Sequence, residues 1–417
     1  MESIIIKGGH KLEGKISVHG SKNSCLPLLA AVILTEDVCV IHNCPDLTDV
    51  LAAVKILEYL GCRVERDGDV ISVDSKCLTR CDIPESLMRE MRSSIVFLGS
   101  VLSRLGQADM YTPGGCEIGL RPIDLHLSAL KTLGAEIDES HGKLSCKRDG
   151  KLKGRNIDLP FPSVGATENI ILACAVSDGV TNIYNAAREP EIAVLVDFLN
   201  KCGAKISISS DGTVSICGVE RLHGCEFSVI PDRITAATYM AAVVSAGGDV
   251  LVENVIPLHL KSVISVFEQT GCKLNISKNS LRIKVPDVVL PIRNVRTMPY
   301  PGFPTDAQAP VMAMATKANG TSVIVENIFE SRFKHVPQLL RLGAKIKIED
   351  RVAVIDGVKN LYGAKVEATD LRGGGSLIVA ALRAEGTTEI TQTQHIDRGY
   401  EKIETALGNI GADIKRG

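Results

Sequence analysis

Residues 130–137 read LKTLGAEI, in which the apolar end of a helix is followed by glycine, a small residue, a charged residue and a β-former. The same pattern returns at residues 57–64, 199–206, 267–274, 339–346 and 407–414, and successive glycines lie 68 to 73 residues apart. Such a regular period indicates an internal repeat. Each glycine suits the position that ends a helix and turns the chain into a strand.

Each repeat contains a second helical stretch that is apolar almost all round, as expected of a helix buried inside a domain. These stretches are residues 23–34, 93–105, 166–176, 234–245, 307–317 and 375–384. Short β-patterned segments lie between them. The six αβ units predict an α/β fold of two domains with three units each, in which the helices are buried and the sheets lie outside.

The domain boundary has no glycine-rich or charged linker, and counting repeats places it between Gly218 and Ile230. Strand-like residues 4–6 and 15–19 precede the first complete helix pair, so they are free to pair with the C-terminal half. We therefore expect one domain over residues 22–230 and a second built from residues 1–21 with 231–417. The active-site cleft is expected between them.

Composition excludes several classes of protein. The 417 residues are 45% hydrophobic and 23% charged, and their net charge of −2 gives no global attraction to nucleic acid or to anionic membranes. No apolar run approaches the ~20 residues that cross a bilayer. The 13 cysteines are odd in number and form no CxxC pair, which argues against a zinc site and a disulfide framework. We expect a cytoplasmic protein that does not insert into membranes.

Cations stand at the start of four of the buried helices, namely Lys22, Arg92, Arg233 and Arg372. A cation there opposes the helix dipole and costs about 0.3–1 kcal/mol, whereas helix N-termini attract anions. One interpretation is that the side chains bend away to surface carboxylates. The other, which four equivalent positions favour, is a polyanionic ligand bound where the two domains present these helix ends.

Asp306 ends the stiff segment YPGFPTD at residues 300–306. A carboxylate among cations suits a charge stabiliser or a weak general base, and a plain helix N-cap is the alternative. Arg398 is expected to open the last helix before Gly411 and to bind an anion. Arg332 is a weaker candidate because Glu330 offers it a local partner.

The segment MYTPGGCEIGLRP, residues 110–122, is predicted to be a turn or exposed loop because of its proline and glycines. Cys116 lies at its tip and Arg121 near its base. A thiol beside a guanidinium suits proton transfer or attack next to an anionic substrate, although a small core residue is the alternative reading of any one cysteine. We expect residues 113–119 to be ordered mainly with ligand bound.

Several motifs lie in order along the chain: GSKN at 20–23, PGGC at 113–116, SVGAT at 163–167, REPEI at 188–192, PDRI at 231–234, PGFPTD at 301–306, DLR at 370–372 and HIDRGYE at 395–401. Together they resemble the UDP-N-acetylglucosamine 1-carboxyvinyltransferase (enolpyruvyltransferase) family over residues 6–411. The resemblance implies a two-domain inside-out α/β barrel. It also implies transfer of enolpyruvate from phosphoenolpyruvate to the 3′-hydroxyl of UDP-N-acetylglucosamine, with release of phosphate.

The resemblance further implies the first committed step of peptidoglycan synthesis, needed for cell wall biogenesis, cell shape and cell division. It implies neither metal nor organic cofactor, small-molecule substrates as the partners, no nucleic acid, and a monomer or weak homo-oligomer. Cys116 corresponds to the family's general acid, which phosphoenolpyruvate can trap as a covalent adduct and which fosfomycin alkylates. Asp306 corresponds to the carboxylate that faces the sugar hydroxyl.

The remaining site residues follow from the same resemblance. Lys22, Arg121 and Arg398 correspond to ligands of the phosphoenolpyruvate phosphate, and Arg372 to a carboxylate ligand. The implied nucleotide-sugar contacts are Asn23, Arg92, Arg121, Pro122, Ile123, Asp124, Leu125, Ser163, Val164, Gly165 and Ile328.

The chain departs from the family pattern at three places: Ser21, Ala237 and the triplet Gly373, Gly374 and Gly375, which is expected to loosen the loop that carries Arg372. Two other functions remain open. An enolpyruvyltransferase acting on shikimate 3-phosphate would share the fold but lack the cysteine loop. A catalytically silent paralogue would bind the nucleotide sugar without turning it over.

Overall fold

The computed structural model describes residues 2–112 and 123–417. They form two compact units, which we call unit I (residues 2–19 and 231–417) and unit II (residues 20–112 and 123–230). The chain passes from unit I to unit II after His19 and returns at Pro231. Among the described helices, none has the length and apolar character that crossing a membrane requires.

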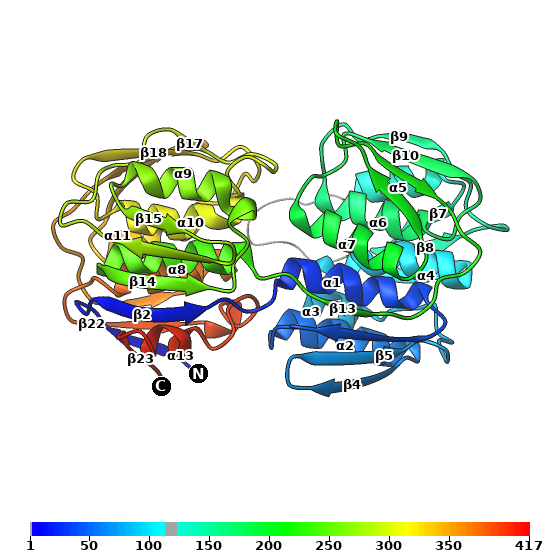
Figure 1. The fold of residues 1–417 in the computed structure, drawn as a ribbon, viewed down its shortest axis with the longest axis horizontal. Helices are drawn as coiled ribbons and strands as arrows, with labels where there is room; N and C mark the ends of the chain where they lie inside the picture. The colour runs from blue at the N-terminus through cyan, green and yellow to red at the C-terminus, as the bar shows by residue number, and fades with distance from the viewer. Residues whose placement is uncertain (1, 113–122) are drawn as a thin grey trace. The chain divides into compact units, whose positions relative to one another are not determined.

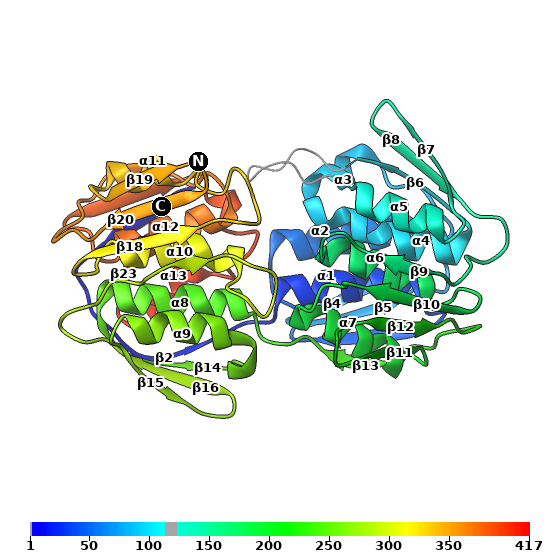
Figure 2. The same cartoon turned by 90° about the horizontal axis from the view of Figure 1, so that it is seen from above.

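Unit I has three buried helices, α8 (Arg233–Ala246), α10 (Thr305–Ala315) and α12 (Leu371–Ala381), which pack against one another inside its sheets (Figure 1 and Figure 2). Its strands are β1 (Ile4–Lys7), β2 (Leu12–Ser17), β14 (Gly248–Glu253), β15 (Lys273–Ile276), β16 (Ser280–Lys284), β17 (Val295–Arg296), β18 (Thr321–Val325), β19 (Lys345–Glu349), β20 (Val352–Asp356), β21 (Lys365–Glu367), β22 (Thr387–Thr391) and β23 (Asp413–Arg416). They form sheets of order β21-β22-β1-β23, β15-β16-β14-β2 and β17-β18-β20-β19. The shorter helices are η3 (Pro257–Leu260), α9 (Lys261–Gln269), α11 (Val336–Arg341), η4 (Thr393–His395) and α13 (Ile403–Gly408).

Unit II repeats this plan (Figure 2). Its buried helices are α1 (Lys22–Ala31) continued by η1 (Val32–Leu34), η2 (Arg92–Val96) continued by α4 (Phe97–Leu105), and α6 (Val164–Cys174). Its strands are β3 (Val38–His42), β4 (Arg63–Asp67), β5 (Val70–Asp74), β6 (Gln107–Tyr111), β7 (Glu136–Ser140), β8 (Lys143–Lys147), β9 (Asn156–Asp158), β10 (Val180–Tyr184), β11 (Lys205–Ile208), β12 (Val214–Cys217) and β13 (Glu226–Ser228). The sheet orders are β13-β3-β5-β4, β11-β12-β10-β9 and β6-β8-β7. The other helices are α2 (Thr48–Leu60), α3 (Glu85–Glu90), α5 (Asp124–Thr132) and α7 (Pro190–Lys201).

The repeat glycines mark the turn from helix to strand in each of the six repeats. Gly61, Gly134, Gly203, Gly271, Gly343 and Gly411 all have φ between 80° and 105°, a left-handed conformation that favours glycine. A strand begins two residues after each of them, at β4, β7, β11, β15, β19 and β23. The predicted α/β class with six repeats, buried helices and outer sheets is confirmed.

Some predicted bounds were wrong. The first two buried helices each contain a 3₁₀ segment, and α12 begins at Leu371 because Asp370 caps it, accepting hydrogen bonds from the backbone N–H groups of Arg372 and Gly373 at 3.0 Å. Arg398 does not open the last helix, since α13 begins only at Ile403 and Arg398 lies in the turn before it.

Candidate active site

Lys22 is the first residue of α1, which Ser21 caps through a 3.3 Å hydrogen bond to the Ser24 N–H. Its Nζ lies 2.9 Å from Asp49 Oδ2, and the two side chains are only 9% and 3% exposed. Asp49 is the second residue of α2, 27 positions away, so no local sequence pattern pointed to it. Lys22 thus has a carboxylate partner, but a buried one and not the surface carboxylate of the first interpretation. The anionic-ligand interpretation stays a prediction. A buried charge pair of this kind fixes the ammonium group in one position.

The next predicted cluster of unit II surrounds a buried histidine. Ser163 caps α6 by accepting a 3.3 Å hydrogen bond from Ala166 N–H, and a Cβ on Gly165 would lie 3.0 Å from His126 Cε1. Burial lowers the pKa of His126 to about 4, with Asp124 opposing and Arg92 adding to the shift. The imidazole is thus neutral at pH 7, and the charges of Asp124 and Arg92, two candidate site residues, act on it.

Asn169 holds this histidine in place. Its Nδ2 donates to His126 Nδ1 at 2.8 Å and to Ile95 O at 3.0 Å, while its Oδ1 accepts from Gly99 N–H at 2.8 Å. Because Nδ1 accepts, the ring proton is assigned to Nε2. Asn23, Ile123, Leu125 and Val164 are half-buried, and Asp124 is the exposed first residue of α5.

Unit I brings a carboxylate and two arginines together. Arg332 Nη2 lies 2.6 Å from Asp306 Oδ1, and Arg372 Nη2 lies 3.4 Å from Asp306 Oδ2. Both arginine side chains are 3% exposed, whereas Asp306 is 28% exposed and can reach solvent or ligand. Asp306 is in the first turn of α10 but does not cap it, because Pro304 occupies that position.

Arg332 is the residue that the sequence analysis undervalued. Its expected local partner, Glu330, instead lies 3.7 Å from Arg351. In the described part of the chain, Arg332 Nε and Arg372 Nε and Nη1 are buried without hydrogen-bond partners. Unsatisfied guanidinium N–H groups are costly to bury, which favours their use by an anionic ligand.

The glycine triplet lets the helix that carries Arg372 pack closely against its neighbours. The three glycines lie inside α12, where a Cβ on Gly374 would come 2.5 Å from Ile396 Cγ1 and one on Gly375 would come 2.6 Å from Tyr400 Oη. The Arg372 guanidinium lies 5.4 Å from the Tyr400 ring centroid. The expectation that these glycines loosen the chain is therefore wrong, because they allow close packing of a helix on Tyr400.

Glu326 is a further residue that the sequence did not reveal. It is 1% exposed, and its Oε1 accepts hydrogen bonds from Thr297 Oγ1 at 2.8 Å, Ile328 N–H at 2.9 Å and Phe329 N–H at 3.1 Å. Its Oε2 accepts from Thr305 Oγ1 at 3.0 Å. The carboxylate therefore connects the start of α10, next to Asp306, with the half-buried bend at Ile328.

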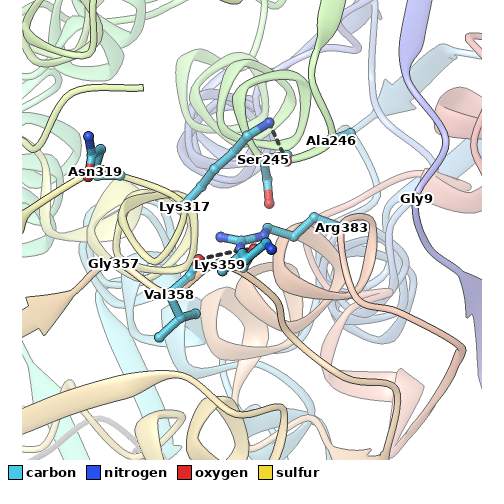
Figure 3. Close-up of a pocket in the computed structure, with 10 residues that line it drawn as sticks. Gly9, Ser245, Ala246, Lys317, Asn319, Gly357, Val358, Lys359 and Arg383 are labelled. Carbon is cyan, nitrogen blue, oxygen red and sulfur yellow. Dashed lines mark hydrogen bonds between the residues drawn. The ribbon is translucent and has the colours of Figure 1, made fainter. Parts of the chain in front are cut away.

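A cavity of about 440 Å³ lies at the other end of the buried helices of unit I (Figure 3). Lys317, Lys359 and Arg383 line it, and Lys317 Nζ donates to the carbonyls of Val244 and Ser245 at 3.0 Å. Burial and the Arg383 charge lower the pKa of Lys317 to about 8. These cations complement helix C-termini, while Asp306 and Arg372 lie at the N-termini of α10 and α12.

Three predicted residues, Cys116, Arg121 and Pro122, lie outside the described residues together with the loop that contains them. Lys22, Asn23, Arg92, Ile123, Asp124, Leu125, Ser163, Val164 and Gly165 belong to unit II, and Asp306, Ile328, Arg372 and Arg398 to unit I. That the candidate residues of unit I and of unit II bind one common ligand stays a prediction.

The fold is that of an enolpyruvyltransferase, and comparison with known proteins agrees. Residues 6–407 match the EPSP synthase (3-phosphoshikimate 1-carboxyvinyltransferase) family. NikO, an enolpyruvyl transferase from Streptomyces tendae, superposes with a TM-score of 0.91 at 24% identity, covering 100% of this chain and 98% of its own. EPSP synthase from Acinetobacter baumannii gives 0.77 at 19% identity, covering 100% and 99%. Likeness at these identities shows the fold alone.

The chain belongs to the enolpyruvyltransferase family, and its sequence relatives carry a narrower name. UDP-N-acetylglucosamine 1-carboxyvinyltransferase 2 of Caldanaerobacter subterraneus subsp. tengcongensis is 49% identical over 411 residues, covering 99% of this chain and 98% of the relative. The protein of the same name numbered 1 in that organism is 47% identical, with 99% of both chains covered. UDP-N-acetylglucosamine 1-carboxyvinyltransferase of Desulfatibacillum aliphaticivorans is 45% identical, with both chains covered completely.

Proposed function

We propose that this protein transfers the enolpyruvyl group of phosphoenolpyruvate to the 3′-hydroxyl of UDP-N-acetylglucosamine and releases phosphate, the first committed step of peptidoglycan synthesis. The observation that carries the proposal is full-length identity of 42–49% to relatives named for this reaction. The silent paralogue has no comparable support. The cytoplasmic location remains a prediction from cysteine usage.

The reaction requires that charge be stabilised at a single carbon. A proton added to C3 of phosphoenolpyruvate leaves an oxocarbenium-like centre at C2, which the sugar hydroxyl attacks. Loss of phosphate from C2 and of a proton from C3 then restores the enol ether. Fixed charges that need not reorganise are the efficient way to stabilise such a centre.

Unit I contributes a carboxylate for the acceptor hydroxyl and a guanidinium for phosphoenolpyruvate in this proposal. We assign Asp306 to the acceptor hydroxyl and the developing positive charge, because Arg332 fixes its Oδ1 at 2.6 Å while its 28% exposure leaves it accessible. We assign Arg372 to the carboxylate of phosphoenolpyruvate. Its Nε and Nη1 groups lack partners in the described structure, and such N–H groups suit a planar carboxylate.

We assign Lys22 of unit II to the phosphate of phosphoenolpyruvate and Cys116, which lies outside the described residues, to the acid. Lys22 is oriented by Asp49 at 2.9 Å, and Cys116 donates the proton to C3. Arg121 and Arg398 complete the phosphate site. The residues assigned to the nucleotide sugar are those implied by the resemblance: Asn23, Arg92, Arg121, Pro122, Ile123, Asp124, Leu125, Ser163, Val164, Gly165 and Ile328.

The test is phosphate release from phosphoenolpyruvate with two acceptors, UDP-N-acetylglucosamine and shikimate 3-phosphate. We expect release with the first acceptor alone and its collapse in a Cys116→Ser variant. Cys77→Ser, which changes an exposed cysteine of unit II, is the matched control and should retain full rate. Release with shikimate 3-phosphate would contradict the proposed acceptor, and tight nucleotide-sugar binding without release would favour the silent paralogue. Release that survives in Cys116→Ser would contradict the assigned acid.

A further inference from the structure

Three thiols meet in unit II, and the proposed reaction uses none of them. Cys39 is in β3, Cys202 follows α7, and Cys225 immediately precedes β13. Cys202 Sγ donates a hydrogen bond to Cys225 Sγ at a distance of 3.3 Å. Cys39 of β3 and Cys225, just before the parallel strand β13, lie next to each other, since Val40 N–H donates to Cys225 O at 2.9 Å.

The three thiols differ in charge and in exposure. The hydrogen bond from Cys202 lowers the pKa of Cys225, with burial and the Cys39 charge opposing and the Lys201 charge assisting, and Lys201 Nζ lies 2.6 Å from the carbonyl of the adjacent Glu226. Cys202 also lowers the pKa of Cys39, to about 7. Cys225 is half-buried, whereas Cys39 and Cys202 are buried. The pKa of Cys202 is raised, first by its hydrogen bond to Cys225. Of the two thiols whose pKa is lowered, Cys225 is therefore the one with access to solvent.

We propose that Cys225 and Cys202 are an oxidisable pair that hydrogen peroxide converts to a disulfide. The Cys225 thiolate attacks one peroxide oxygen, the O–O bond breaks, and the hydroxide that leaves takes up a proton to give water. Cys202 then attacks the Cys225 sulfenic sulfur, forming the S–S bond. The sulfenic oxygen leaves as hydroxide and, with the Cys202 proton, forms a second water. Two thiols are thus oxidised and one peroxide is reduced.

Closing the bond is a short movement for the two sulfurs. The sulfurs must approach from 3.3 Å to the ~2.05 Å of a disulfide. Cys202 is the C-cap of α7, and Cys225 ends the connection between β12 and the three-residue edge strand β13. The disulfide would therefore fasten α7 to the strand just before the chain leaves unit II.

Another thiol pair of the same unit provides an internal comparison. Cys25 and Cys44 are joined by a side-chain hydrogen bond, but they are 0% and 1% exposed, and the pKa of Cys25 is raised by that bond and by burial. Both pairs therefore have two thiols within hydrogen-bond distance of each other. Access and a lowered pKa are present only in the pair that contains Cys225, so Cys25 and Cys44 should stay reduced.

The experiment treats the folded Cys116→Ser protein with a small excess of hydrogen peroxide, blocks free thiols and maps tryptic peptides. We expect residues 202–205 and 222–233 to appear as one linked species, lighter than the two thiol peptides by two hydrogens and separated again by dithiothreitol. In Cys202→Ser the Cys225 sulfenic acid should persist and be captured by dimedone. In Cys39→Ser the Cys202–Cys225 link should still form.

Three results would overturn the proposal. They are a reduced Cys225 after treatment, linkage of Cys225 to Cys39 in place of Cys202, and equal oxidation of the Cys25–Cys44 pair. Thermal unfolding of each variant before treatment identifies any variant that has lost its fold. Dimedone capture at Cys225 in the intact protein under brief exposure tests the first oxidation step without the Cys202 substitution.

Discussion

Units I and II are built from one repeat, but they arrange buried charge differently at their helix N-termini. In unit II, Lys22 and Asp49 balance each other at 2.9 Å. In unit I, a single carboxylate, Asp306, faces Arg332 at 2.6 Å and Arg372 at 3.4 Å. Of these described groups, the pair is neutral and the trio keeps one excess positive charge. The difference is that unit I leaves buried N–H groups of Arg332 and Arg372 without hydrogen-bond partners in the described structure, while unit II pairs its buried cation with a carboxylate.

The largest expected effect comes from removing Asp306. Asp306→Asn should lower kcat for phosphate release by about 100- to 1,000-fold, as loss of a fixed charge at a reacting centre does. The matched change in unit II, Asp49→Asn, should raise the KM for phosphoenolpyruvate about tenfold, because it frees Lys22 from a charge-assisted hydrogen bond. Steady-state kinetics of both variants check this order. If Asp49→Asn reduced kcat as strongly as Asp306→Asn, the two units would not differ as described.

Acid stability offers a second comparison, because each unit buries a neutral histidine. Burial lowers the pKa of His126 and of His335 to about 4, each with a carboxylate opposing (Asp124, Asp370) and an arginine assisting (Arg92, Arg332). Between the ordinary pKa of ~6.5 and about 4, the unfolded chain binds a proton that the folded one does not. Stability must therefore fall as pH drops through this range, by about 3 kcal/mol for each histidine.

Replacing one of these histidines should remove the loss of folding stability at low pH in the unit that contains it. Hydrogen exchange at pH 7 and pH 4.5 measures the opening free energy of helices in each unit separately. His126→Gln should flatten the pH dependence of α6 and leave α12 unchanged, and His335→Gln should do the reverse. A pH dependence that neither variant alters would assign the acid sensitivity to other groups.

The third effect is on folding stability, and it comes from glycines that let a helix pack closely on a neighbouring side chain. Gly375→Ala should destabilise unit I by about 1–3 kcal/mol, because its Cβ would meet Tyr400 Oη at 2.6 Å and force α12 to shift. Gly165→Ala in unit II should cost less, since its Cβ would meet His126 Cε1 at 3.0 Å. Denaturant unfolding measures both. Equal losses would mean that the packing around Arg372 is no tighter than that around α6.

Sequence predicted the parts of this molecule that are set by local geometry. The six glycines with positive φ and the cations that open α1, η2 and α8 are visible because each signal lies within a few residues. Asp49, Arg332 and Glu326 were missed or undervalued, since their partners come from segments 21 to 29 residues away. The triplet at Gly373 was misjudged for the same reason, because Ile396 and Tyr400 determine what those glycines do.

The smallest effect, and the sharpest test of how unit I is assembled, comes from Glu326. Glu326→Gln replaces an acceptor oxygen by an amide donor that faces the Thr305 hydroxyl or the N–H groups of Ile328 and Phe329. If the bend at Ile328 contacts the nucleotide sugar, as proposed, the KM for UDP-N-acetylglucosamine should rise about tenfold while kcat changes little. The KM for phosphoenolpyruvate should be unaffected.

The matched control is Glu330→Gln, which changes an exposed carboxylate four residues away that lies 3.7 Å from Arg351. It should leave both KM values unchanged, because exposed ion pairs contribute little. A fall in kcat for Glu326→Gln without a change in KM would mean that Glu326 acts through Thr305 on Asp306 and not through Ile328. Such a result would link the Thr305 hydroxyl to the position of Asp306, and the geometry of Asp306 between Arg332 and Arg372 would then depend on a carboxylate whose hydrogen bonds in the described part of the chain include neither arginine.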